Sequence, residues 1–245
     1  MMISTIDLTK AFGQIIAVDK ITLQIEPGEL FGFLGPNGAG KTTTINMLTG
    51  LIRPTSGTAI IGGVDVSLNP RQVKAITGLV PDTPKVYETL TGRQFVRFMA
   101  NLYEVDPKVA ENRMEHFLEI FDLVGFEDDL IKGYSYGMQK KILLTAVLVH
   151  KPRLFFLDEP TSGLDPKSAR LVKEILRDLC DEGHTVFMTT HILEIAEKIC
   201  DRMAIIKGGR LVAIGTIDEL RNTEENSDLS LEDIFLELTE DRSYE

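Results

Sequence analysis

The chain has 245 residues, of which 43% are apolar and 26% are charged, a balance typical of a soluble globular protein. It holds 37 acidic residues against 26 lysines and arginines, which gives a net charge of −11. Residues 218–245 alone carry −9, from eleven acidic residues and two arginines, so the body is almost neutral and the composition argues against a strongly nucleic-acid-binding protein.

Three further patterns narrow the class of protein. The longest apolar run, Ile142–Val149, is much shorter than the roughly 18 residues that a membrane-spanning helix needs. The first ten residues contain no basic stretch followed by an apolar one, so we expect no secretory signal. Cys180 and Cys200 have no CxxC or CxxH companion, and we expect them to be reduced core thiols of a cytosolic protein.

The apolar periodicity changes twice along the chain. The first third alternates β-rich runs with turn residues, and the middle has apolar residues at helical spacing, after which strands and helices alternate again. This order predicts an α/β fold with a helical insertion, in which Gly183 ends a helix and Gly208-Gly209 form a hairpin turn. Strands are expected over residues 4–13, 21–30, 30–38, 58–63, 76–81, 153–159, 185–191 and 202–215, and helices over 42–51, 92–103, 106–123, 135–150, 166–183, 192–200 and 230–245.

The segment GPNGAGKT, from Gly35 to Thr42, matches the phosphate-binding pattern G-x-x-x-x-G-K-[ST] between an expected strand and an expected helix. Its glycines let successive backbone N–H groups surround phosphates, aided by the helix N-terminus. Lys41 is expected to reach the β- and γ-phosphates and the Thr42 hydroxyl to bind Mg²⁺; the alternative is a glycine turn with a solvated lysine. The residues expected to contact the nucleotide here are Gly35, Pro36, Asn37, Gly38, Ala39, Gly40, Lys41, Thr42 and Thr43.

Two adjacent carboxylates, Asp158 and Glu159, end the apolar strand RLFFLDE. Open α/β sheets bind ligands at the carboxyl ends of their strands, and a phosphate-binding loop needs a nearby acid to hold Mg²⁺. We expect Asp158 to take that role and Glu159 to polarise the water that attacks the γ-phosphate. The alternative is that one of the two caps the following turn.

Two less specific features follow. The segment SGLD, from Ser162 to Asp165, is by itself a turn with a helix N-cap. His191 ends the strand TVFMTT, and a lone histidine is more often structural. Because this strand follows the one that bears Glu159, a contact from His191 to the γ-phosphate is the better interpretation.

Taken together, the phosphate-binding loop, the helical insertion, a signature before the paired carboxylates, the SGLD loop and the histidine resemble the nucleotide-binding subunits of ATP-binding-cassette (ABC) transporters, over essentially the whole chain. The resemblance implies Mg²⁺ coordination by Asp158, a catalytic base in Glu159 and a switch histidine in His191, with Lys41 also in the catalytic set. It places Asp165 in a loop that communicates across a dimer. The resemblance also implies that Phe12 stacks on adenine, the alternative being a packed strand residue.

The resemblance also implies a division of the chain. The fold would be a P-loop NTPase core with an N-terminal antiparallel β subdomain and an inserted α-helical subdomain. Residues 1–84 and 151–217 would form the core, residues 85–150 the helical signature subdomain and residues 218–245 an acidic tail, all within a single ATP-binding domain.

The chain departs from the family pattern at two places. Asp82 stands where the family usually has a glutamine that reaches the metal and water, so Mg²⁺ contact by a shorter, charged side chain is expected. The signature L-S-G-G-Q is replaced by YSYGM, residues 134–138, which keeps Ser135 and Gly137, the two positions that face the nucleotide. This variant is typical of exporter-type members.

The family implies an ATPase subunit that binds ATP and Mg²⁺ and drives a transporter, an exporter in this case. Because the signature acts on ATP held by the opposite subunit, a dimer with an identical or sister ATP-binding subunit is expected. An integral membrane subunit would form the passage, so the chain would lie peripherally on the cytoplasmic face of the cell membrane, and no nucleic acid is expected as a partner. The docking surface would include the aromatic residues of the helical block, which could equally be subdomain core: Tyr87, Phe95, Phe98 and Tyr103.

Two other functions compete with transport. A soluble cassette ATPase could act on nucleic acid, ribosomes or cluster assembly, but translation-type members normally hold two cassettes, and this chain has one and no basic extension. A P-loop GTPase or small-molecule kinase is disfavoured because there is no N-K-x-D guanine-reading motif, and neither explains YSYGM or His191.

Overall fold

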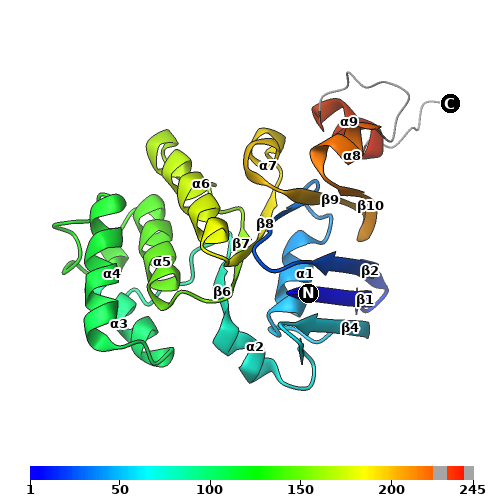
Figure 1. Ribbon diagram of the computed structural model, residues 1–245. Coiled ribbons are helices and arrows are strands. Elements are labelled where there is room, and N and C mark those ends of the chain that lie inside the picture. The colour runs from blue at the N-terminus through cyan, green and yellow to red at the C-terminus, as the bar shows by residue number, and fades with distance from the viewer. Residues whose placement is uncertain (223–230, 240–245) are drawn as a thin grey trace.

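The computed structural model describes residues 1–222 and 231–239, which form an α/β structure (Figure 1). Its central sheet has six strands: β3 (Leu30–Leu34), β6 (Thr77–Val80), β7 (Leu154–Asp158), β8 (Thr185–Thr190), β9 (Arg202–Lys207) and β10 (Arg210–Gly215). Their order is β10-β9-β3-β8-β7-β6, and all pairs are parallel except that of β10 with β9. Every residue of β3, β7 and β8 is buried, as expected of strands covered on both faces.

A second, antiparallel sheet contains β1 (Ile3–Phe12), β2 (Ile15–Ile25), β4 (Ser56–Ile61) and β5 (Val64–Asp65), in the order β2-β1-β4-β5. One face of this sheet packs on the core and the other meets solvent. In β2, Ile21, Leu23 and Ile25 are buried, and the residues between them are exposed. This alternation is the pattern of a half-buried antiparallel strand.

Helices cover both faces of the central sheet. Helix α1 (Lys41–Leu48) lies between the two sheets, in contact with β4 and β7 (Figure 1). Helices α6 (Pro166–Asp181) and α7 (Leu193–Ile199) contact β8 and β3 from the other face. The remaining helices of this part are α2 (Pro70–Ile76), α8 (Ile217–Asn222) and α9 (Leu231–Thr239).

A helical subdomain extends beyond β6 and β7, away from the antiparallel sheet (Figure 1). It consists of α3 (Gly92–Leu102), α4 (Pro107–Ile120), the 3₁₀ helix η1 (Ile131–Gly133) and α5 (Tyr136–His150). Side chains cap each α-helix at its first turn. Thr91 and Gln94 form a reciprocal capping box at α3, Asp106 caps α4, and Ser135 caps α5 by accepting from the Met138 N–H.

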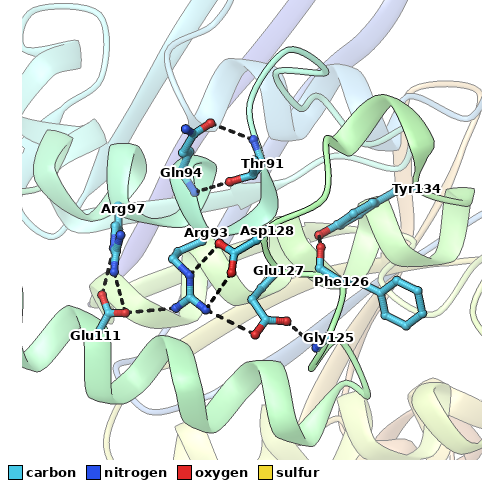
Figure 2. A network of polar contacts seen from close by, with 10 residues as sticks. All are labelled: Thr91, Arg93, Gln94, Arg97, Glu111, Gly125, Phe126, Glu127, Asp128 and Tyr134. Atoms are coloured by element: carbon cyan, nitrogen blue, oxygen red, sulfur yellow. Dashed lines mark hydrogen bonds and ion pairs between the residues drawn. The ribbon is translucent and has the colours of Figure 1, made fainter.

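Polar contacts of Arg93 and Arg97 fix the outer part of this subdomain (Figure 2). Arg93 on α3 donates to Asp128 at 3.0 Å, to Glu111 on α4 at 3.2 Å and to Glu127 at 3.3 Å. Arg97, one turn further along α3, donates to both carboxylate oxygens of Glu111, and this pairing lowers the pKa of that carboxyl. One guanidinium therefore joins α3, α4 and the segment that precedes the signature.

The structure confirms the predicted fold class, the helical insertion and the turns at Gly183 and Gly208-Gly209. Some boundaries differ. Helix α1 ends at Leu48 instead of Leu51 because Gly50 turns left-handed, with φ 66°, and Ile76 ends α2 instead of opening a strand. Helix α2 was not predicted, since seven residues with one buried side chain show no periodicity.

The acidic segment is only partly described. Its residues 223–230 and 240–245 lie outside the described residues, as do the ends of the helix expected over 230–245, whose described part is α9. Among the helices described here, none combines the length and the apolar character that a membrane crossing requires.

The Arg93 network leads to a prediction about stability. Replacing Arg93 with methionine keeps most of the side-chain volume but removes three ion pairs, so the free energy of unfolding in urea is expected to fall by about 1–3 kcal/mol. Because the folded-state pKa of Glu111 is lowered, the contribution of that carboxylate is present at neutral pH and is lost as the pH falls through this lowered pKa. Arg170→Met, which removes an exposed pair on α6, should change stability by under about 0.5 kcal/mol. Equal effects of the two substitutions would contradict the role of the network.

Candidate nucleotide site

The sheet topology brings the predicted site residues to one edge. Leu34, the last residue of β3, pairs with Thr190 of β8, and Asp158, the last residue of β7, pairs with Thr189 of β8. The segments that follow these three strands therefore leave the sheet side by side. In open α/β sheets, ligands bind outside the carboxyl ends of the strands at such a point.

The loop after β3 has no room for larger residues at two glycines. A Cβ on Gly35 would lie 2.4 Å from the carbonyl oxygen of Ile206, so the loop passes directly against β9. Gly40 has φ 108°, and a Cβ there would lie 2.5 Å from the carbonyl oxygen of Ala17. Helix α1 begins at the next residue, Lys41, so its free N–H groups and positive end open toward the loop. The local structure is that of an anion-binding helix start.

The Lys41 side chain folds over this loop and is almost fully buried. Its ammonium donates to the carbonyl oxygens of Gly35 at 2.7 Å and Pro36 at 3.3 Å. It also lies 3.7 Å from the Glu159 Oε1 atom. Lys41 is thus held by the loop while it neutralises charge at the centre of the site.

Asp158 joins three elements through its carboxylate. Oδ2 accepts from the Thr42 hydroxyl on α1 at 2.6 Å, and Oδ1 accepts from the Thr189 hydroxyl on β8. The carboxylate is buried, so the two hydroxyls hold it in one orientation. A carboxylate and a hydroxyl in contact offer the hard oxygen ligands that Mg²⁺ prefers, so the residues present fit that ion.

Glu159 follows directly in an unusual backbone conformation, with φ 49°. Its N–H donates to both the carbonyl and the hydroxyl of Thr189 at 3.2 Å. Its carboxylate lies 3.0 Å from Nδ1 of His191, the residue after β8, whose own side chain is half exposed. A carboxylate held between a histidine and a lysine, at a strained peptide, has the features of a catalytic position.

Lys41, Thr42, Asp158 and Glu159 line one cavity of about 200 Å³. Its wall combines loop backbone, the first turn of α1 and three carboxylates. The lining residues are Ala17, Asn37, Gly38, Gly40, Lys41, Thr42, Thr43, Asp82, Asp158 and Glu159. The structure therefore brings together most of the residues that the sequence predicted for phosphate, metal and water.

Eight predicted residues do not line this cavity: Gly35, Pro36 and Ala39 of the loop, His191, and the more distant Phe12, Ser135, Gly137 and Asp165. Ser135 and Gly137 are at the start of α5, and Asp165 is the N-cap of α6, where it accepts from Ser168 and pairs with Lys141 at 3.3 Å. The Ser168 hydrogen bonds hold the pKa of Asp165 far below its usual value. Phe12, at the end of β1, is about half exposed under the Lys10 ammonium, which disagrees with the packed-strand alternative.

Sequence reasoning missed two residues that contact the site from α5. Tyr136 donates its hydroxyl to the carbonyl oxygen of Asp82 at 2.8 Å, and Lys140 donates to the carbonyl oxygens of Asp82 and Glu159. Lys140 has no exposed surface, and this burial lowers its pKa. Burial likewise raises the pKa of Tyr136, so its hydroxyl keeps its proton. The only signal in the sequence is their spacing of four, which places them on one helix face.

The fold and the site define a P-loop nucleoside triphosphatase whose helical subdomain is inserted between β6 and β7. Residues 18–162 match the sequence profile of the family described as ABC transporter. The chain belongs to the ABC transporter family and is an ATPase of its ATP-binding type.

Relatives and solved structures agree with this assignment. The chain is 38% identical over 219 residues to the linearmycin resistance ATP-binding protein of Bacillus subtilis, and the alignment covers 89% of this chain and 70% of the relative. It is 41% identical over 221 residues to the daunorubicin/doxorubicin resistance ATP-binding protein of Streptomyces peucetius, and that alignment covers 90% of this chain and 67% of the relative. A solved ATP-binding subunit of an ABC transporter superposes with a TM-score of 0.94 at 30% identity, covering 98% of this chain and all of that one.

Proposed function

We propose that this chain binds and hydrolyses ATP as one of two ATP-binding subunits that drive an ABC transporter, an exporter, whose passage is formed by a separate integral membrane subunit. The observation that carries the proposal is the convergence of Lys41, Thr42, Asp158 and Glu159 in one cavity. Its similarity to a linearmycin resistance ATP-binding protein and to a daunorubicin/doxorubicin resistance ATP-binding protein supports export.

The charged and polar residues of the site have chemical roles in this proposal. The loop N–H groups and Lys41 bind the phosphates and neutralise their charge. Glu159 orients the attacking water and accepts its proton, and the contact with His191 holds that carboxylate in place. Thr42, Asp158 and Asp82 would hold Mg²⁺, which neutralises phosphate charge when bound. Phe12 is exposed and is proposed to stack on the adenine.

The signature residues are proposed to act on a second chain. Ser135 and Gly137 start α5 and lie outside the cavity of their own chain. The first turn of α5 presents free N–H groups and the positive end of a helix, which suits a γ-phosphate. A partner's nucleotide would be bound between this turn and the partner's loop, with Asp165 at the same interface.

A groove beside the helical subdomain is proposed to receive the membrane subunit. It has a volume of about 990 Å³, and its apolar wall includes Tyr87, Phe98, Met99 and Leu102. Of the four aromatic residues predicted for docking, Phe95 is buried core and Tyr103 stacks on His150, so Tyr87 and Phe98 remain the exposed candidates. The helical subdomain, proposed to span residues 85–150, would transmit movement between this groove and the ATP site. The chain would thus lie at the cytoplasmic face of the membrane.

Removal of the base tests the catalytic assignment. Glu159→Gln keeps the size of the side chain but cannot accept a proton, so kcat is expected to fall by a factor of about 10² or more, with the dissociation constant for ATP essentially unchanged. Steady-state phosphate release and binding of a fluorescent ATP analogue measure the two quantities. Unchanged hydrolysis would refute the role of Glu159.

Mixed dimers test the shared site. A mixed dimer of a Lys41→Ala subunit and a Ser135→Arg subunit keeps no more than one site with an intact loop and an intact signature, so it should retain about half of the activity per dimer. Each variant alone should be inactive. Two active sites would refute the shared-site proposal. No activity in the mixed dimer would mean that the chain completes its own site, because each chain would then carry one defect.

The groove predicts a membrane partner. Affinity purification of the tagged chain from detergent-solubilised native membranes is expected to recover an integral membrane subunit, and Phe98→Glu, which places a charge on the apolar wall, is expected to lose it. Val124→Glu, at an exposed position outside the groove, is the control. Recovery of ribosomes in place of a membrane protein would overturn the transport proposal.

A further inference from the structure

Two side chains of α5 meet at one backbone oxygen beside the candidate site. The Tyr136 hydroxyl and the Lys140 ammonium both donate to the carbonyl oxygen of Asp82, at 2.8 and 3.3 Å. The two residues are four apart, so they project from one face of the helix. The Asp82 side chain is half exposed, and its Oδ1 atom is 3.9 Å from Lys140. The loop is therefore bound mainly through its main chain.

Lys140 extends this contact to the proposed base. Its ammonium also donates to the carbonyl oxygen of Glu159 at 2.5 Å. That carbonyl ends a peptide whose φ of 49° is uncommon for a residue with a side chain, and it also accepts from the Ser162 N–H at 3.1 Å. The position of the Glu159 backbone thus depends in part on a side chain of the helical subdomain.

The Tyr136 ring contacts a third loop. A Cβ on Gly163 would lie 2.4 Å from a ring carbon of Tyr136, so the ring packs directly on the backbone of the segment between Ser162 and Asp165. The start of α5, which also carries Ser135 and Gly137, is therefore in contact with the Asp82 loop, the Glu159 turn and the 162–165 loop. We call Tyr136 and Lys140 the α5 clamp.

We propose that the α5 clamp couples the two ATP sites. When the signature turn of one chain contacts the partner's nucleotide, the clamp positions Glu159 in the site of its own chain. The inference rests on the proposed function, since it needs a signature that acts in trans. In this chain the side chain at position 82 is a short carboxylate, and the connection to the helical subdomain runs through its carbonyl to Tyr136 and Lys140. Both are positioning residues.

Because Lys140 is buried, its role in positioning Glu159 can be tested separately from any contribution to stability. The fully buried Lys140 ammonium contacts two carbonyls and lies 3.9 Å from one carboxylate, so it loses most of its hydration. Both carbonyls keep a second donor if Lys140 is replaced, namely Tyr136 and Ser162. Methionine at this position should therefore leave the melting temperature unchanged or raise it, although the link to Glu159 is lost.

The test compares Tyr136→Phe, Lys140→Met and Lys140→Arg in the full chain, with Lys151→Met as the matched control. Lys151 follows α5 and pairs with a surface carboxylate, Glu182. We expect kcat to fall about threefold in Tyr136→Phe and about tenfold in Lys140→Met, with KM for Mg·ATP within about twofold of wild type. Arginine should restore part of the loss, and the double variant Tyr136→Phe/Lys140→Met should be worse than either single variant, because it removes both donors to the Asp82 carbonyl.

Hydrogen exchange gives a second readout that does not depend on turnover. In a Glu159→Gln background, Mg·ATP should slow exchange of the Ser162 amide, which donates to the carbonyl of position 159, and adding Lys140→Met should abolish that change. If wild type hydrolyses ATP and Tyr136→Phe and Lys140→Met keep its kcat and exchange response, the clamp is refuted and the proposed function stands. If wild type hydrolyses no ATP, it is the proposed function that fails. If the variants with a lower kcat also have a lower melting temperature, Tyr136 and Lys140 stabilise the fold and do not position Glu159.

Discussion

Glu159 has a left-handed backbone conformation that contacts with four residues hold in place, and the geometry of the site depends on these contacts. Its N–H is bound by Thr189 of β8, its carbonyl by Lys140 of α5, and its carboxylate lies between Lys41 of α1 and His191. A non-glycine residue in this region of backbone space costs on the order of 1–2 kcal/mol, so it persists only where the surroundings determine it. A shift of any one of these elements therefore changes where the proposed base points.

The strand order of the central sheet positions Asp158 and the phosphate-binding loop. Because β3, β8 and β7 are neighbours, the Asp158 carboxylate bridges the Thr42 hydroxyl of α1 and the Thr189 hydroxyl of β8. The phosphate-binding loop is in turn pressed against β9 and β2, where Gly35 and Gly40 leave no space for a Cβ. A rigid sheet edge thus carries the loop and the acids, whereas the helical subdomain reaches them through α5. The carboxylates are therefore held by the sheet and α1, whereas the backbone of Glu159 is held in part by the helical subdomain.

The sequence was sufficient for features encoded by short local patterns. The loop from Gly35 to Thr42, the paired acids and the strand-terminal histidine each follow a strand, so their meeting at one sheet edge could be predicted from strand–helix order alone. The α5 clamp could not, because Tyr136 and Lys140 contact residues more than 50 positions earlier in the chain, and a lysine in a polar helix turn usually indicates solvent exposure. Similarly, nothing in the spacing distinguished buried Phe95 from exposed Phe98; tertiary packing decided that.

A structure of the Glu159→Gln variant with Mg·ATP is the most direct test of the central claim, that two chains share each nucleotide and that α5 links the signature to the base. The expected result is a dimer in which each γ-phosphate lies between Lys41 of one chain and Ser135 of the other, with Tyr136 and Lys140 still bound to the carbonyl of Asp82. A nucleotide-bound chain whose Ser135 faces solvent, or whose α5 has separated from Asp82 and from position 159, would contradict it.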